Sequence, residues 1–192
     1  MAMGIGGIHP DMAYKNRTVE EQKTRQAETE ETKGTSFSDN VLTCTSVGGK
    51  KAMLCQDALF SMASFVTGES VNVYKAEGFS ETNPVYLVKG IDSKGNEYEK
   101  TINADEVNPH SCSFLELSVL NVHAGKSGKD SFMQMAMVHA RVGDSEESFF
   151  NKVNYNQAVA DTLKDYQTMK AWDSYLRCNS WWQGIMDYYL SK

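Results

Sequence analysis

The sequence predicts an α+β fold in which an antiparallel β-meander packs against a C-terminal helical subdomain, with a flexible leader in front. Two observations predict this class. Residues 70–102 alternate apolar and polar side chains, and apolar residues after position 107 recur at helical spacing. We therefore expect one domain over residues 40–192, mainly β over 40–107 and mainly helical over 108–192.

The N-terminal segment, residues 1–39, is expected to be a disordered or partner-dependent leader. Its stretch from Asn16 to Gly34 has only Val19 and Ala27 as apolar side chains. So little apolar surface does not offset the entropy that a backbone loses when it is ordered. We expect order in this segment only when a partner binds it.

Residues 41–67 give mixed signals. Gly48 and Gly49 fit a short hairpin, but the apolar residues that follow also recur at helical spacing, namely Leu54, Ala58, Met62 and Phe65. We expect a hairpin and then a segment up to Gly68. The choice between helix and strand stays open for residues 50–67.

Three strands are predicted next, from the segments SVNVYKAE, NPVYLVKGI and NEYEKTI. They alternate in polarity or are rich in β-branched and aromatic residues. The last two flank Asp92–Asn96, where Gly95 suits a left-handed turn position, so they form a predicted hairpin. Lys and Glu on one face indicate that this face meets water while the other packs on helices.

Helical signals begin at Asn108, a suitable N-cap, and Pro109, which suits the first helical position. Leu115, Val119 and Val122 then share one face of the predicted helix. Asp130 is expected to cap a second helix.

Three more helices are predicted after residue 143. Asp144 and Glu147 fit a capping box for a short third helix. A long fourth helix is predicted from an apolar stripe of Tyr155, Val159, Tyr166, Met169, Trp172 and Leu176. Asn179 and Ser180 are expected to interrupt it, so that a final helix folds back as a hairpin.

The segment AGKSGKD, residues 124–130, looks like a phosphate-binding loop but lacks an essential glycine. The Walker pattern needs a glycine five positions before Gly125, where this chain has Leu120. The alternative register places His123 at that position and Asp130 after the lysine. We therefore predict that Gly125 closes a helix in the left-handed conformation, with Lys126 near the negative end of its dipole.

Composition excludes several classes of protein. A formal net charge of -6 disfavours nucleic-acid binding, which needs Lys and Arg to neutralise phosphates. The sequence has no run of 18 apolar residues and no secretory-signal pattern, so we expect a cytoplasmic protein that does not bind membranes. Leaderless export stays open. The cysteines and histidines share no metal-ligand spacing, so no metal or cofactor site is predicted.

The preferred functional hypothesis rests on the aromatic residues near the C-terminus. Two pairs of aromatic residues are sequence neighbours, Trp181–Trp182 and Tyr188–Tyr189. Adjacent residues on a helix diverge by about 100°, so one member of each pair should fall outside a single buried stripe. The surplus predicts a surface for a protein partner or for self-association, because Trp, Tyr and Met are enriched at interfaces. The candidate interaction residues are Tyr175, Trp181, Trp182, Met186, Tyr188 and Tyr189. We therefore expect a noncatalytic interaction or assembly module; absorption of every ring into the core is the alternative.

A second hypothesis is a small enzyme or ligand-binding domain whose site lies between the sheet and the helices. Its candidate residues are Cys112, His123 and His139, since a thiol and imidazoles could meet through tertiary folding. The sequence contains no G-x-S-x-G elbow that would support hydrolysis. Surface or core positions are the alternative for each histidine.

The segment NPVYLVKGIDSKGNEYEKTINADEVNPHS combines an NPVY strand, a hairpin of the form G.D..G..YE and an NP helix start. In these features it resembles uncharacterised proteins of clostridia-type gut bacteria, mainly over residues 70–125. The resemblance implies a bacterial, noncatalytic protein and supplies no catalytic residues.

Overall fold

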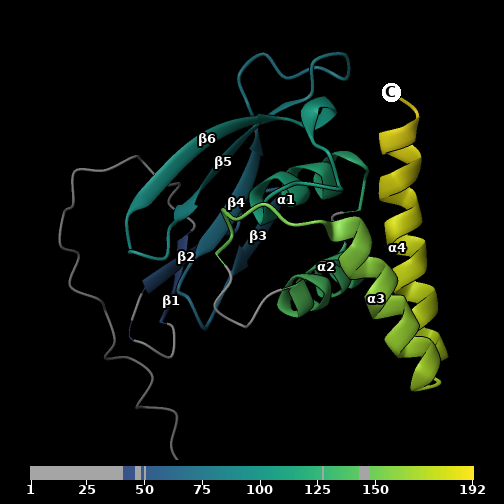
Figure 1. Ribbon diagram of the computed structural model, residues 1–192. Helices are drawn as coiled ribbons and strands as arrows, with labels where there is room; N and C mark the ends of the chain where they lie inside the picture. The colour runs from purple at the N-terminus through teal and green to yellow at the C-terminus, as the bar shows by residue number, and fades with distance from the viewer. Residues whose placement is uncertain (1–40, 46–48, 50, 127, 143–147) are drawn as a thin grey trace, which may run out of the picture. The chain divides into compact units, whose positions relative to one another are not determined.

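The computed structural model describes residues 41–45, 49, 51–126, 128–142 and 148–192, and the predicted leader lies outside them. The strands are β1 (Val41–Thr45), β2 (Lys51–Cys55), β3 (Phe60–Ala63), β4 (Ser70–Lys75), β5 (Val85–Ile91) and β6 (Glu97–Asn103). A 3-10 turn, η2 (Ala104–Glu106), leads to α1 (Phe114–His123), α2 (Lys129–Val142), α3 (Tyr155–Thr168) and α4 (Trp172–Leu190). The predicted α+β class is confirmed (Figure 1).

The main sheet is antiparallel, with the strand order β3-β4-β5-β6. The three predicted strands are β4, β5 and β6, and the turn between the last two is confirmed. Asp92 N–H donates to the Asn96 carbonyl at 2.9 Å, and Gly95 has a φ of 88°. β1 and β2 form a separate antiparallel pair. The meander thus follows from sequence-local signals: alternation within strands and a glycine at the turn.

The ambiguous segment is a pair of strands rather than a helix. β3 pairs with β4, with Phe60 opposite Val73, and β2 is held to β4 by side chains. The carboxamide of Asn72 accepts from the Cys55 N–H at 2.9 Å and donates to the Met53 carbonyl at 3.1 Å. A buried amide that bonds β2 explains why extended structure prevails here over the helical spacing of the apolar residues.

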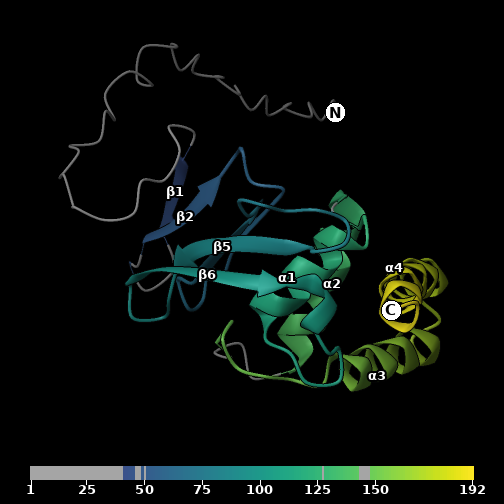
Figure 2. The same cartoon turned by 90° about the horizontal axis from the view of Figure 1, so that it is seen from above.

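The two faces of the sheet have different neighbours. Val71, Val73 and Val88 are buried in the same core as α1, whose Phe114 and Leu117 are also fully buried. In the view of Figure 2 the helices lie to one side of β5 and β6, and β1 and β2 lie toward the other. α1 is therefore the central element between the sheet and the remaining helices.

α1 starts later than the sequence predicts. Its N-cap is Ser113, whose hydroxyl accepts from the Glu116 N–H, while the Glu116 carboxylate accepts from the Ser113 N–H at 2.6 Å. The predicted start at Asn108 and Pro109 is wrong, because an antiparallel β-bridge to Val153 holds the backbone of Cys112 in an extended conformation. This reciprocal capping box satisfies two N–H groups at the helix start.

The end of α1 is as predicted. Gly125 has a φ of 69°, and the Ala124 N–H donates to the Leu120 carbonyl at 2.9 Å. The Lys126 N–H returns to the Asn121 carbonyl at 2.9 Å. The AGKSGKD segment therefore leaves a helix through a left-handed glycine, which is the geometry of a helix end.

The later helices differ from the prediction. α2 begins at Lys129, so Asp130 lies in its first turn and not at its cap. The capping box at 144–147 lies outside the described residues, and residues 148–153 are not helical.

The chain reverses between α3 and α4, and not at Asn179 and Ser180. Lys170 adopts a φ of 57° there, and α4 continues through residues 179 and 180. The continuous helix is favoured because Cys178 and Trp181, on either side of the expected break, are both buried. Burial of this face outweighs the weak helix propensity of Asn and Ser.

Candidate functional site

Trp181 and Trp182, two of the candidate interaction residues, are both buried. The Trp181 indole N–H donates to Asn121 Oδ1 on α1 at 2.8 Å, and the Trp182 indole N–H donates to Asn156 Oδ1 on α3 at 3.3 Å. The expectation that one ring stays outside is wrong for this pair. α4 packs against two helices, so directions about 100° apart both lead into the interior.

The other predicted interaction residues are partly buried. The Tyr188 hydroxyl donates to the Asp105 carboxylate, and the Tyr189 hydroxyl donates to Asn108 Oδ1 at 3.3 Å. Met186 packs on the core, and the ring of Tyr175 also contacts it. Most of these side chains therefore attach α4 to the rest of the domain.

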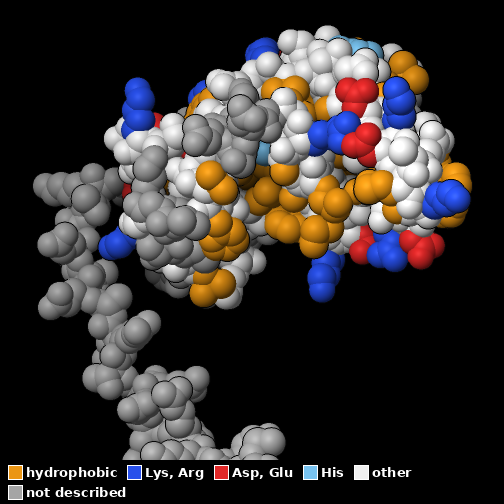
Figure 3. All heavy atoms as spheres, turned by 60° about the horizontal axis from the view of Figure 1, so that its bottom comes forward, with side chains coloured by type: hydrophobic (Ala, Val, Ile, Leu, Met, Phe, Trp, Pro, Cys, Tyr) orange, Lys and Arg blue, Asp and Glu red, His pale blue; other side chains and the backbone are white. Residues whose placement is uncertain are grey.

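A different set of apolar side chains is exposed on the helices. We call it the α2–α4 apolar surface, and it consists of Met133, Met137, Met169, Trp172 and Leu176. Trp172 is 56% exposed and Leu176 is 62% exposed. Figure 3 shows hydrophobic side chains gathered on the side of the molecule that faces down in Figure 1, where α2 and the α3–α4 turn lie. Sequence reasoning missed this surface because it placed Trp172 and Leu176 on the apolar stripe of one long helix, together with Tyr155 and Tyr166.

α2 is in direct side-chain contact with the α3–α4 hairpin beside this surface. The Tyr166 hydroxyl of α3 lies 3.5 Å from the Met137 sulfur of α2. Met133 and Met137 are four residues apart on α2, as Trp172 and Leu176 are on α4. Residues with this spacing share a helix face, so each helix presents one exposed apolar pair.

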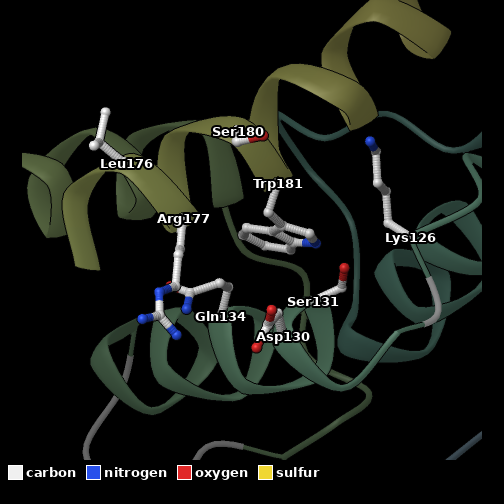
Figure 4. A pocket seen from close by; sticks show the side chains of 8 residues that line it. All are labelled: Lys126, Asp130, Ser131, Gln134, Leu176, Arg177, Ser180 and Trp181. Carbon is white, nitrogen blue, oxygen red and sulfur yellow. The ribbon is translucent and has the colours of Figure 1, made fainter. Parts of the chain in front are cut away.

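A hollow of about 340 Å³ adjoins the apolar surface; we call it the α2–α4 hollow. Figure 4 shows α4 on one side of it, α2 on the other and Lys126 at one end. Its lining residues are Lys126, Asp130, Ser131, Gln134, Leu176, Arg177, Ser180 and Trp181. The hollow thus combines two cations, one carboxylate, two hydroxyls and an indole.

Two features of this hollow are set by the packing behind it. Gln134 is only 6% exposed, and its Oε1 has no hydrogen-bond partner among the described residues. Lys126 lies against α4 at Gly184, where a built Cβ would be 2.0 Å from Lys126 Cε. The missing side chain at Gly184 is therefore what lets the lysine stem lie along α4.

A second hollow, of about 250 Å³, lies between β6 and the start of α1. Its two lysines already have partners. Lys152 Nζ lies 3.6 Å from the Glu116 carboxylate, and Lys100 Nζ lies 4.6 Å from the centre of the Phe150 ring. Because its cations are engaged, this hollow is a weaker anion site than the α2–α4 hollow.

The three residues of the enzyme hypothesis have different neighbours. Burial raises the pKa of the Cys112 thiol to about 12, so it is protonated at neutral pH and is a poor nucleophile. His139 Nδ1 lies 2.7 Å from the Tyr155 hydroxyl in the core, and His123 Nδ1 lies 3.0 Å from the Tyr86 hydroxyl. These hydrogen bonds place the two histidines in separate clusters.

The described residues also contain no group of three or more His, Cys, Asp or Glu that could hold a metal ion. In the same part of the chain, none of the helices has the length and hydropathy required to cross a membrane. Comparisons with protein-family models, with curated proteins and with solved structures find no match.

The environment of His123 at the end of α1 predicts a pH dependence of the protein's stability. Burial lowers the pKa of His123 below 6.5, against the opposing effect of the carboxylates of Glu81 and Asp105. The folded state therefore binds this proton less readily than the unfolded chain, and the free energy of unfolding falls as pH decreases below 6.5. We expect His123→Gln to flatten this part of the stability profile.

The measurement is urea unfolding at several pH values from about 7.5 down to about 5, with Tyr86→Phe as the control that keeps the imidazole. Wild type should lose more stability than His123→Gln over this range. Parallel profiles for the two proteins would contradict the pKa shift.

Proposed function

We propose that this chain is a noncatalytic, cytoplasmic interaction module that binds an amphipathic helical segment of a partner protein through the α2–α4 apolar surface. The single observation that carries the proposal is the exposure of Trp172 and Leu176 together with Met133 and Met137. Clustered apolar side chains of this kind mark interaction sites on proteins that otherwise have polar surfaces. The resemblance over residues 70–125 supports a bacterial, noncatalytic protein.

The arrangement of the two apolar pairs favours a helix as the occupant. Two neighbouring helices each expose an apolar pair at i and i+4. An amphipathic helix can lay its own i, i+3, i+4 face across two such pairs. Methionine side chains adapt to the shape of a partner because they are unbranched and polarisable.

Charge next to the surface favours acidic residues on the partner. In the α2–α4 hollow, Lys126 and Arg177 outnumber Asp130, although the whole chain carries a net charge of -6. Arg141 on α2 is paired with Asp165 of α3, so it adds nothing to this local excess of positive charge. A local excess of positive charge on an acidic protein steers a negatively charged partner to this position.

The test is a selection of short amphipathic helices from a displayed library whose polar faces are acidic, neutral or basic in equal numbers. We expect wild type to enrich acidic helices with micromolar affinity. Trp172→Ala combined with Leu176→Ala should weaken binding of the selected peptides by about tenfold or more, because buried aromatic anchors dominate such interfaces. Fluorescence anisotropy would measure the affinities.

The matched control is Phe65→Ala combined with Val66→Ala, which also removes two exposed apolar side chains but lies between β3 and β4. This variant should bind the selected peptides as wild type does. Equal weakening by both double variants, or enrichment of basic helices, would overturn the proposal. So would a concentration-dependent dimer in sedimentation velocity that Trp172→Ala with Leu176→Ala abolishes, because a second copy would then occupy the surface.

A further inference from the structure

We propose that the partner helix carries three charged residues in register with the α2–α4 hollow. A carboxylate faces Arg177, an arginine one turn away faces Asp130, and a second carboxylate two turns from the first faces Lys126. This inference rests on the helix-binding proposal and specifies which helices the surface selects. It follows from the positions of the charges along the hollow and from one buried acceptor that has no hydrogen-bond partner among the described residues.

The two cations lie at opposite ends of the hollow. Arg177 belongs to α4, and in Figure 4 its guanidinium lies beside the Gln134 amide at one end. Lys126 lies at the other end against Gly184, where a built Cβ would be 2.5 Å from Lys126 Nζ. Gly184 follows Arg177 by seven residues, which is two turns of helix and a rise of about 10.5 Å. Two carboxylates spaced two turns apart on a partner helix match this separation.

Hydrogen-bond acceptors occupy α2 opposite these cations. Asp130 is exposed and lies between the two ends in Figure 4. Gln134, one turn further along the same face of α2, is 6% exposed, and its Oε1 has no hydrogen-bond partner among the described residues. An unsatisfied buried amide oxygen is costly, so a donor from a partner is favoured here. An arginine has several N–H donors and can serve two acceptors on adjacent turns.

The same lining disfavours other charge orders. A carboxylate at the central position of the partner would face the carboxylate of Asp130, and neither group has a hydrogen to donate. A second carboxylate placed three turns from the first would lie beyond Gly184, where Lys126 is held. The hollow therefore selects the order of charges on a helix as well as their sum.

The hollow continues the α2–α4 apolar surface along α4. Leu176 belongs to both, Trp172 lies one turn before it, and Arg177 is the next residue. A straight partner helix that lies along α4 therefore passes over the apolar pair and then over the hollow. We expect the apolar anchors of the partner at one end of its binding face and the charged residues at the other.

The experiment is a binding titration of the full-length chain with designed peptides that keep the apolar anchors of a selected helix. Glutamates stand at i and i+4, i and i+7, or i and i+11, with arginine at i+3 and the same composition in every peptide. Each spacing is made with the glutamates before and after the anchors, because the helix can lie along α4 in either direction. Circular dichroism checks that the peptides are equally helical. In fluorescence anisotropy we expect the i, i+7 spacing to bind at least about fivefold more tightly than the other two.

A change at the central position of the peptide tests the acceptors. Replacing its arginine by glutamate should weaken binding to wild type by about tenfold or more. Asp130→Asn and Gln134→Met should each reduce this preference for arginine, because each change removes a charged or buried acceptor. Asp130 is exposed, so Asp130→Asn keeps the test decisive if Gln134→Met impairs folding.

Four protein variants test the spacing. Arg177→Gln and Lys126→Gln should each remove the advantage of the i, i+7 peptide. Gly184→Ala keeps every charge but displaces Lys126, so it should also remove this advantage. Lys164→Gln, which removes an exposed cation on α3 outside the lining of the hollow, is the control and should preserve the advantage.

Three results would overturn this inference. These are equal affinities for the three spacings, binding that is unchanged when glutamate replaces the central arginine, and an i, i+7 advantage that persists in both Arg177→Gln and Lys126→Gln. If these peptides still lose affinity for Trp172→Ala with Leu176→Ala, the helix-binding proposal stands without the charge register. A library that yields no helix binding to wild type would overturn both proposals.

Discussion

Gly90→Ala is expected to lower the free energy of unfolding by about 3 kcal/mol or more, because an added methyl group has no space in the sheet. A Cβ built on Gly90 lies 1.9 Å from the Ser70 carbonyl oxygen and 2.7 Å from the Ser70 carbonyl carbon. Both atoms belong to the backbone of β4, so no side-chain rotation relieves the overlap. β4 and β5 would have to separate where their ladder joins Ser70 to Ile91.

The ring of Tyr98 adds to this effect. Tyr98 is paired with Gly90 across β5 and β6, and its hydroxyl donates to the Ser70 carbonyl at 2.8 Å. The phenol thus crosses the glycine, and the added Cβ would also lie 2.8 Å from the Tyr98 oxygen. Gly90 is therefore required by close approach and not by a left-handed backbone conformation.

Urea unfolding followed by circular dichroism would measure the change. Gly128→Ala is the matched control, because a Cβ there meets nothing within 4 Å. It should change stability by no more than about 1 kcal/mol, the usual effect of alanine at a helix N-cap, because the Gly128 carbonyl accepts the first hydrogen bond of α2. Gly90→Ala with Tyr98→Phe should remain as unstable as Gly90→Ala, since the clash with the β4 backbone persists. A Gly90→Ala protein within about 1 kcal/mol of wild type would contradict this account.

The strands could be predicted from the sequence where their signals are local. β4, β5 and β6 alternate in polarity, and Gly95 supplies the turn between the last two. The strand structure of β2 and β3 could not be predicted in the same way. β2 depends on Asn72, whose amide bonds Met53 and Cys55 some 17 to 19 positions earlier in the chain, and β3 depends on its pairing with β4.

The helices show the same limit. Gly125 was predictable as a helix end because one residue type determines that geometry, whereas the reversal at Lys170 has no glycine or proline to mark it. A left-handed lysine is permitted there because the tertiary packing of α3 on α4 compensates for its strain. Misplacing this turn is what put Trp172 and Leu176 on the apolar stripe of one long predicted helix.

The candidate site is still harder to infer from the sequence. Lys126, Gln134 and Arg177 lie on three segments, and only the folding of α4 over α2 brings them to one hollow. Gln134 offered a partial signal, as a polar residue within the apolar run FMQMAM. A polar side chain at a buried helix position needs a hydrogen-bond partner. Where the protein itself supplies none, the position is a candidate contact for a ligand.

Glu69→Ala is expected to destabilise the protein by about 3–5 kcal/mol, since it removes the acceptor of one buried and two partly buried donors. The Glu69 carboxylate is fully buried, and it accepts from the Thr67 hydroxyl at 2.9 Å, the Ser148 hydroxyl at 2.6 Å and the Phe149 N–H at 3.2 Å. Without it the Phe149 N–H is left unsatisfied in the core. The backbone of Phe149 would then be less firmly held, and with it the ring, whose centre lies 4.5 Å from that of Phe114.

Milder substitutions should separate the contributions of the individual hydrogen bonds that the Glu69 carboxylate accepts. Glu69→Gln keeps one oxygen for the Phe149 N–H and turns an amide toward the Ser148 hydroxyl, which can accept as well as donate, so we expect a loss of about 1–2 kcal/mol. Ser148→Ala should cost a similar amount. In a double-mutant cycle of Glu69→Ala and Ser148→Ala measured by urea unfolding, the double variant should lose less stability than the sum of the two single losses, because both changes remove the same hydrogen bond. Strict additivity would show that Glu69 and Ser148 do not interact, and the loop before α3 would then be held to β4 by something other than this carboxylate.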